Sequence, residues 1–209
     1  MKKIGVSQRV DYIQSYGERR DSLDQKWTNL LLDVGLYPIP LPNLKADLVE
    51  DFMSVLNLDG ILLTGGNSLS HLDVNNCSNA PERDVFEKAL VEKSMAIHLP
   101  LLGVCRGMQL LNHQFDGQCS KVQNHAGTTH PLKSLTYDLE FPSEVNSFHH
   151  WGIAMEELAS DLIPLAVDTH GYVEAMKHRE ANIYGIMWHP ERDKTFQSEN
   201  IELLKAIFL

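Results

Sequence analysis

The segment Leu101-Leu102-Gly103-Val104-Cys105-Arg106-Gly107-Met108-Gln109 joins a short apolar run directly to an amphipathic stretch. The apolar run is typical of a strand buried on both faces, and the pattern over residues 106–113 predicts a helix. Glycines stand two residues before and two residues after Cys105, where a sharp strand-to-helix turn leaves no room for bulky side chains. We therefore expect Cys105 to lie at the carboxyl edge of a parallel sheet, where α/β proteins bind their ligands.

The expected position of Cys105 favours a reactive thiol. A helix N-terminus carries a partial positive charge, which stabilises a thiolate relative to a thiol. The backbone N–H of Arg106 would also point toward an oxyanion that forms on a substrate. A buried cysteine whose glycine neighbours serve packing alone is the alternative interpretation. The other two cysteines, Cys77 and Cys119, have no such turn, and we assign them no role.

The first half of the chain alternates apolar runs with amphipathic stretches. We predict strands over residues 4–7, 60–64 and 101–104, an extended piece over residues 37–40, and helices over residues 22–34, 44–56, 81–95 and 106–113. Strands and helices that alternate at this spacing imply right-handed crossovers. The expected fold is therefore an α/β sandwich in which helices cover both faces of a parallel sheet.

The second half differs because its strand candidates are joined by turns rather than by helices. They lie over residues 135–141, 163–167, 173–177 and 183–187, before a closing helix over residues 198–209. This pattern predicts an antiparallel extension of the same sheet. The chain has no Gly/Ser/Pro linker, internal repeat or low-complexity tract, so we expect one domain that spans residues 1–209.

The composition excludes several kinds of partner. Eighteen basic and 28 acidic side chains give a formal net charge of −10, which disfavours nucleic acid and anionic membranes as partners. A local arginine cluster can still bind one nucleotide or phosphate. No apolar run approaches the roughly 18 residues of a membrane span, and the N-terminus lacks a secretory apolar core. Together with an odd number of widely spaced cysteines, this predicts a cytoplasmic protein without disulfides. The sequence specifies no oligomeric state.

A thiol nucleophile needs a base that takes and returns its proton, and the base needs a group that orients it. The run over residues 183–187 ends in Trp188-His189-Pro190-Glu191, where the proline fixes the backbone between an imidazole and a carboxylate. Both side chains would leave the end of one strand close together. A surface turn is the alternative for this motif by itself, but its combination with the glycine-flanked Cys105 is far more specific.

Four segments together resemble one known family: GVCRGMQLLN, MWHPER, LLTGGNS and VNSFHHWGI. They are similar to the class I glutamine amidotransferase superfamily, and best to its γ-glutamyl-γ-aminobutyrate hydrolase branch. Arg83-Asp84, before the cysteine turn, favours this branch over the amidotransferase domains of synthetases. The resemblance implies a flavodoxin-like three-layer sandwich, a catalytic triad of Cys105, His189 and Glu191, and an oxyanion hole formed by the backbone N–H groups of Gly66 and Arg106.

The resemblance also implies which residues bind the glutamyl group. Gln109 lies one helical turn after the nucleophile, and this position contacts the glutamyl head group in the superfamily. A second substrate loop matches the segment that contains Asn146, Ser147, His149, His150 and Trp151. Three departures from the family pattern are Trp151 in place of glutamine, Met187 in place of glutamine and His170 in place of aspartate. These three positions belong to the rim of the cleft in the family. The departures therefore concern which leaving group is bound, and not the type of reaction.

Two further clusters admit more than one interpretation. Arg9, Arg19 and Arg20 follow the first strand, so they can bind a carboxylate or phosphate of the leaving group, or they can pair with the neighbouring acids Glu18 and Asp21.

The histidines form the other cluster. His125 and His130 also match a loop of the family, and we assign them no catalytic role. A metal pair or a polar surface is the alternative interpretation of the double histidine His149-His150. Zinc requires three or four convergent ligands, and no second ligand cluster has the spacing of a metal site, so we expect neither a metal nor another cofactor.

The reaction expected from these residues is hydrolysis of a γ-glutamyl amide, with a small γ-glutamyl compound as the partner. Cys105 attacks the carbonyl, His189 protonates the leaving amine, and water releases glutamate. Within the branch, the chain most resembles stand-alone enzymes that hydrolyse γ-glutamyl-CDP-amidate in capsule phosphoramidate biosynthesis, whose leaving group is nucleotide-linked. The alternative is a glutaminase subunit that supplies ammonia to a separate synthetase.

Overall fold

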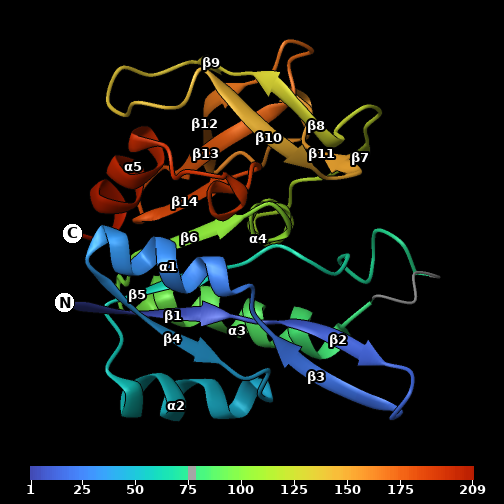
Figure 1. The fold of residues 1–209 in the computed structure, drawn as a ribbon, viewed down its shortest axis with the longest axis vertical. Helices are drawn as coiled ribbons and strands as arrows, with labels where there is room; N and C mark the ends of the chain where they lie inside the picture. The colour runs from blue at the N-terminus through green and yellow to red at the C-terminus, as the bar shows by residue number, and fades with distance from the viewer. Residues whose placement is uncertain (75–78) are drawn as a thin grey trace.

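The computed structural model describes residues 1–74 and 79–209, and its centre is an eight-stranded mixed sheet (Figure 1). The strand order is β4 (Leu36–Leu41), β1 (Lys2–Ser7), β5 (Gly60–Leu63), β6 (Leu101–Val104), β14 (Ile183–Ile186), β13 (Val173–His178), β12 (Leu162–Val167) and β9 (Lys133–Ser134). The strands from β4 to β14 in this order pair in parallel. From β14 onward the neighbours β13, β12 and β9 pair antiparallel, so β14 belongs to both parts of the sheet. The predicted α/β fold, with a mostly parallel sheet and an antiparallel extension, is confirmed.

Helices cover both faces of this sheet. On one face lie α1 (Gln25–Val34) and α5 (Ser198–Phe208), and on the other lie α2 (Val49–Leu56), α3 (Pro81–Ala96) and α4 (Arg106–Gln114). Helix α1 begins where the Asp24 side chain accepts a hydrogen bond from the backbone N–H of Lys26 at 2.9 Å, and it ends at Gly35, whose φ of 87° is left-handed. The predicted helix over residues 44–56 starts later, because residues 46–48 form a 3₁₀ turn.

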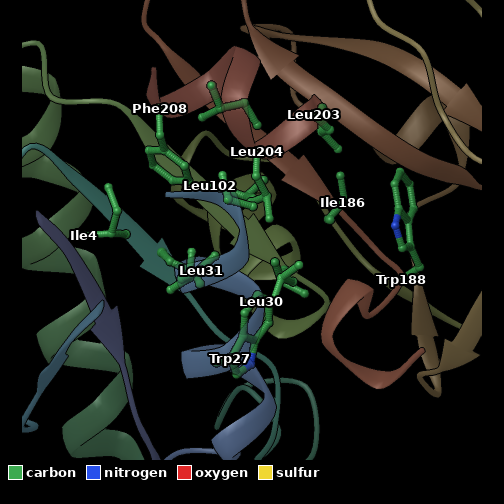
Figure 2. Close-up of a cluster of buried hydrophobic side chains, with 14 of the residues drawn as sticks. Ile4, Trp27, Leu30, Leu31, Leu102, Ile186, Trp188, Leu203, Leu204 and Phe208 are labelled. Carbon is green, nitrogen blue, oxygen red and sulfur yellow. The ribbon is translucent and has the colours of Figure 1, made fainter. Parts of the chain in front are cut away.

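The core under α1 and α5 fixes the strands that carry the candidate site. Figure 2 shows Trp27, Leu30 and Leu31 of α1 together with Leu203, Leu204 and Phe208 of α5, packed over Leu102 and Ile186 of the sheet. At Gly60 an added Cβ would stand 2.7 Å from the Phe208 ring, so glycine lets α5 lie close to β5. Trp188, directly before His189, donates its indole N–H to Asn200 on α5 at 2.9 Å. The core therefore sets where the chain leaves β14.

One predicted strand is wrong. Residues 135–141 form no strand, and only Lys133 and Ser134 before them pair with β12. Leu139 and Phe141 pack against the core from an irregular segment, while Tyr137 is fully exposed. The apolar side chains of Leu139 and Phe141 are therefore explained by packing against the core and not by strand pairing.

The sequence also missed three two-stranded ribbons. A hairpin of β2 (Arg9–Ile13) and β3 (Glu18–Ser22) projects beyond the end of β1, and β8 (Ala126–Pro131) pairs with β10 (Glu144–Phe148) (Figure 1). The third ribbon joins β7 (Ser120–Lys121) to β11 (Trp151–Gly152). All three lie outside the main sheet and have few buried residues, which explains why hydrophobic periodicity does not reveal them. None of the helices in the described part of the chain combines the length and apolarity that a membrane crossing requires.

Candidate active site

Cys105 stands at the junction between β6 and α4, in a backbone conformation that few residues adopt. Its φ of 52° and ψ of −103° place it outside the helical and extended regions, directly before the first residue of α4. A Cβ on Gly103 would meet the backbone of Gly107 at 2.6 Å, and one on Gly107 would meet the carbonyl oxygen of Leu63 at 2.5 Å. Both glycines are therefore required for the turn, as the sequence predicts.

His189 reaches the same edge because β14 is parallel to β6. Its ring donates an Nδ1–H hydrogen bond to Oε1 of Glu191 at 2.8 Å, and both side chains are almost fully buried. The main chain of His189 is held by Asn146: the amide oxygen accepts from the His189 backbone N–H at 3.0 Å, and Nδ2 donates to its carbonyl at 2.7 Å. The ring and the backbone of His189 are thus fixed by different partners.

The electrostatics of this pair suit proton transfer. Burial alone would lower the pKa of His189, but the charge of the Cys105 thiolate, a hydrogen bond with that side chain and the contact with Glu191 together raise it to about 9. A histidine with this pKa carries a proton near neutral pH, and it lies beside the Cys105 side chain. Such a pair can combine a nucleophile with an acid that protonates a leaving group.

A pocket of about 380 Å³ opens onto these two side chains. Most of the predicted site residues line it: Gly66, Cys105, Arg106, Gln109, His149, His150, Trp151 and His189. Gln109 donates from Nε2 to the carbonyl oxygen of Trp151 at 2.9 Å, so the two predicted binding segments are in direct contact. Burial, followed by the nearby charge of His125, lowers the pKa of His149 to about 3, so this ring of the pocket wall is neutral.

Two residues of the predicted substrate loop do not line the pocket. Asn146 holds the main chain of His189, and Ser147 donates its hydroxyl to the carbonyl oxygen of His125 at 2.6 Å with its side chain fully buried. The Asn146 side chain thereby supports a residue of the pocket wall, whereas Ser147 holds His125, which does not line the pocket. Both side chains are thus occupied by contacts with other segments of the chain.

The glycine turn after β5 is held by a buried network of charges. Arg83, fully buried on α3, donates to the carbonyl oxygens of Thr64 at 2.7 Å and Gly66 at 2.6 Å, and to Glu87 at 2.8 Å. Glu87 also accepts a hydrogen bond from the side chain of Arg106. Burial lowers the pKa of Arg83 to about 10; burial would raise that of Glu87, but Arg106 and Arg83 hold it below its usual value. This network fixes Gly66 and Arg106, the two predicted oxyanion donors, relative to each other.

The three arginines after the first strand lie on the β2–β3 hairpin and outside the pocket. Arg20 donates to Glu18 at 2.8 Å, and Arg19 donates to Glu82 on α3 at 2.9 Å. Arg9 pairs with Asp11 at 3.1 Å, and its aliphatic part lies beside Gly66. Of the pairs with Glu18 and Asp21 that the sequence suggests, only the one between Arg20 and Glu18 is present among these contacts; the Asp21 carboxylate accepts hydrogen bonds from Asn43 instead.

Two cationic residues that the sequence analysis missed do line the pocket, Lys121 and Arg192. Lys121 lies in β7 with its ammonium 5.4 Å from the centre of the Trp151 ring, and the guanidinium carbon of Arg192 lies 4.5 Å from the centre of the Phe148 ring. Arg192 directly follows Glu191, so its proximity to His189 could have been predicted from the sequence. Lys121 reaches the pocket only through the pairing of β7 with β11.

Cys119, the other cysteine that the structure describes, differs from Cys105. Burial raises the pKa of Cys119 to about 12, so this thiol stays protonated and unreactive at neutral pH. Cys77 lies outside the described residues.

Comparisons with known proteins agree with this geometry. The sequence profile of the family described as Peptidase C26 matches residues 3–137 and 125–191. The γ-glutamyl-CDP-amidate hydrolase of Campylobacter jejuni is 35% identical over 98% of this chain and 96% of its own length. The glutamine amidotransferase-like protein YvdE of Lactococcus lactis is 31% identical over 88% of this chain and 85% of its own length.

The fold has counterparts among solved structures as well. A glutamine amidotransferase from Thermotoga maritima superposes with a TM-score of 0.68 at 14% identity, covering 98% of this chain and 83% of its own.

Proposed function

Because the chain belongs to the peptidase C26 family of class I glutamine amidotransferase-like proteins, we propose that it hydrolyses γ-glutamyl amides with Cys105 as nucleophile. The observation that carries this proposal is the junction of β6 and α4, where Cys105 faces the pocket together with a histidine held by Glu191. The family resemblance expected from the sequence is confirmed by the match with the family.

The proposed reaction has two halves. The Cys105 thiolate adds to the γ-carbonyl carbon, and the oxyanion accepts hydrogen bonds from the backbone N–H groups of Gly66 and Arg106. The C–N bond then breaks, and protonated His189 gives its proton to the leaving amine, which leaves a glutamyl thioester. In the second half His189, now neutral, takes a proton from water as the water attacks the thioester. Release of glutamate restores the Cys105 thiolate beside a protonated His189.

Glu191 orients the ring throughout this cycle and stabilises its charged form, without being protonated itself. Gln109 supports the wall that receives the glutamyl head group, through its hydrogen bond to the carbonyl of Trp151. Its amide oxygen can then accept a hydrogen bond from the α-amino group of the substrate.

For the leaving group we propose an anionic, phosphate-bearing amine of the kind that γ-glutamyl-CDP-amidate carries. One support is the Campylobacter jejuni relative, which covers nearly the whole chain. Another is the presence of Lys121 and Arg192 in the pocket of a protein with a net charge of −10, because local cations are needed to offset the field of an acidic protein around an anionic ligand. These two residues replace the hairpin arginines Arg9, Arg19 and Arg20 as our first candidates for the phosphate contacts.

The test compares released glutamate from three substrates: glutamine, a neutral γ-glutamyl anilide and γ-glutamyl-CDP-amidate. We expect the isolated chain to hydrolyse the phosphate-bearing substrate at least tenfold more efficiently than the other two. Lys121→Ala should raise KM for that substrate by about tenfold and leave KM for glutamine unchanged, since one charge-assisted contact contributes on the order of 1.4 kcal/mol. Arg20→Ala, on the exposed hairpin, is the matched control and should change neither value.

The results of these assays distinguish the choice of leaving group from the hydrolysis reaction itself. Equal efficiency on all three substrates, or an equal effect of Lys121→Ala on each, would overturn the anionic leaving group while leaving the hydrolase intact. Hydrolysis of glutamine alone, without turnover of substituted amides, would favour the role of ammonia supplier to a synthetase. The reaction itself would be overturned if the chain hydrolyses none of the three, or if its Cys105→Ala variant remains active.

A further inference from the structure

A group of ionisable side chains lies behind the pocket wall, away from the nucleophile's own partners. We call it the histidine–carboxylate cluster, and it consists of His125, His130, His149, Asp168 and Glu174. Its members come from the β8–β10 ribbon and its flanks, from the end of β12 and from β13, segments that lie beside each other in the upper part of Figure 1. All are buried except His130, whose side chain is 13% exposed. The mechanism described above uses none of them for chemistry.

The three histidines share one tautomeric arrangement. In each ring Nδ1 faces a backbone carbonyl oxygen: His125 that of Gln123 at 2.7 Å, His149 that of Trp151 at 3.0 Å, and His130 that of Pro131 at 3.3 Å. A carbonyl oxygen only accepts, so Nδ1 must carry the hydrogen in all three rings. The Nε2 atoms of His130 and His149 then face inward with no hydrogen-bond partner among the described residues, while Nε2 of His125 lies beside Asp168. Metal-binding histidines are typically oriented in this way, with the second ring nitrogen donating to a carbonyl or carboxylate.

Glu174 faces these nitrogens without a hydrogen bond. Its side chain is 1% exposed, and among the described residues neither carboxylate oxygen has a hydrogen-bond partner. The Nε2 atom of His130 lies 3.7 Å from one oxygen and that of His149 lies 3.7 Å from the other, and both nitrogens likewise lack a partner in the described part of the chain. Four buried polar atoms thus converge without a hydrogen bond between any two of them. A carboxyl group buried in this way is either protonated or paired with a cation, and a metal ion is a cation that both histidine nitrogens and the carboxylate can bind.

We propose that His125, His130 and Glu174 bind a divalent transition-metal ion of the zinc type. One ligand atom from each lies within 4.8 Å of the other two. Two ligand atoms bound tetrahedrally to zinc at about 2.1 Å stand about 3.4 Å apart, so modest closing movements of these side chains, about 1 Å or a little more, assemble the site. Two imidazoles and one carboxylate suit zinc rather than magnesium or calcium, which prefer oxygen ligands alone.

Asp168 completes the surroundings of the ion. Its carboxylate lies 2.9 Å from Nε2 of His125, the ring nitrogen opposite the one that faces the carbonyl oxygen of Gln123. A metal ion bound to this nitrogen takes the place of the hydrogen that joins it to Asp168. Asp168 thus borders the site at His125, and His149 borders it at the second oxygen of Glu174, 3.7 Å away.

The ion has a structural role in this arrangement. It joins His130 on β8 to Glu174 on β13, and so ties the ribbon that carries the substrate loop to the antiparallel end of the main sheet. The sequence predicts no metal, because no second ligand cluster along the chain has the spacing of a metal site. The fold brings together ligands from two segments far apart in the chain, which spacing along the sequence cannot reveal.

The test uses the full chain, purified without chelator, incubated with excess Zn²⁺ and desalted, with metal content measured by mass spectrometry. We expect about one metal ion per chain. Removing it with EDTA should lower the melting temperature by about 5–10 °C, and Zn²⁺ should restore it. The chain reloaded with Co²⁺ should show visible absorption bands from nitrogen ligands. Glu174→Gln and His130→Gln should each reduce the metal content at least tenfold and abolish these bands.

His98→Asn is the matched control, because His98 is an exposed histidine outside the cluster and its φ of 56° is one that asparagine tolerates. This variant should retain the full metal content; loss of the ion here would place it elsewhere and overturn the proposal. Less than a tenth of an equivalent in the wild-type chain after exposure to Zn²⁺, Co²⁺, Mn²⁺ and Fe²⁺ in turn, with a melting temperature indifferent to EDTA, would do the same. So would a Glu174→Gln chain that melts higher than wild type and still binds the metal. None of these results depends on the reaction at Cys105.

Discussion

Replacing Gly65 with alanine tests whether the position of the His189 ring controls the reaction. An added Cβ at Gly65 would stand 2.5 Å from Cε1 of His189, whereas carbon atoms in contact are about 3.5–4.0 Å apart. Either the ring or the turn must therefore move by about 1 Å. The turn cannot yield easily, because Arg83 donates to the carbonyl oxygens of Gly65 at 3.1 Å and Gly66 at 2.6 Å. The ring is the element that gives way.

The size of the effect follows from this displacement. A shift of about 1 Å in a reacting group can cost on the order of a hundredfold in rate, which corresponds to about 2.7 kcal/mol. The ring would also leave its 2.8 Å contact with Glu191. We expect Gly65→Ala to lower kcat about a hundredfold while KM changes by less than threefold, since the walls that bind the glutamyl group lie on other segments.

The assay is steady-state release of glutamate from a γ-glutamyl amide, with the melting temperature measured alongside. Gly17→Ala is the control: in the β2–β3 turn an added Cβ meets open space among the described residues, but φ is +64°, so the change costs about 1–2 kcal/mol of stability and leaves kcat within twofold. A Gly65→Ala chain that folds normally and keeps a third or more of the wild-type kcat would refute the reasoning. In that case His189 would not act from the position described.

Three further predictions follow from the same site. Cys105→Ala should abolish glutamate release while the chain still melts cooperatively, and residual turnover above a few per cent would contradict the assignment of the nucleophile. Because the pKa of His189 is raised to about 9, above the roughly 6.5 of an unfolded histidine, its pairing with Cys105 stabilises the fold fully below pH 6.5 and ceases to do so as pH rises through 9. The melting temperature of the wild type relative to that of Cys105→Ala should therefore fall as the pH rises from 6.5 to 9. A difference that stays constant over this range would contradict the ion pair. Glu87→Gln should cost about 3–5 kcal/mol in urea unfolding, because it removes the carboxylate that pairs with the fully buried Arg83 and leaves Arg106 with Asp84 alone. Glu82→Gln, which changes an exposed partner of Arg19, should cost less than about 1 kcal/mol.

Local sequence was sufficient for the elements whose geometry is set by their own residues. The turn at Cys105 follows from two glycines that admit no Cβ, and the strands on either side of it follow from continuous apolar runs. In both cases the steric or hydrophobic cause lies within a few residues of the effect. The edge that His189 shares with Cys105 depends instead on the parallel pairing of β14 with the distant strand β6, whereas the sequence pattern places residues 183–187 in the antiparallel extension.

The elements that sequence reasoning missed depend on partners distant in the chain. The hairpin strand β3 reads Glu-Arg-Arg-Asp-Ser and has almost no buried residue, so its pairing with β2 leaves no hydrophobic signal. Lys121 enters the pocket because β7 pairs with β11, about thirty residues later. Glu87 lies four residues after Arg83 on one face of α3, a spacing that is also common for exposed ion pairs. It belongs to a buried network because Arg106 on α4 is its second partner, and the sequence does not show that contact.

The clamp that Asn146 forms around the main chain of His189 makes the backbone amide of that histidine a local reporter. This N–H donates to a side chain on β10, so it can exchange with solvent deuterium only when the ribbon separates from the end of β14. Such an opening requires far less exposure of apolar surface than unfolding of the main sheet does. A low concentration of denaturant should therefore abolish turnover while the circular dichroism signal of the sheet is unchanged. The exchange rate of the His189 amide would measure how often the protein opens to this inactive state.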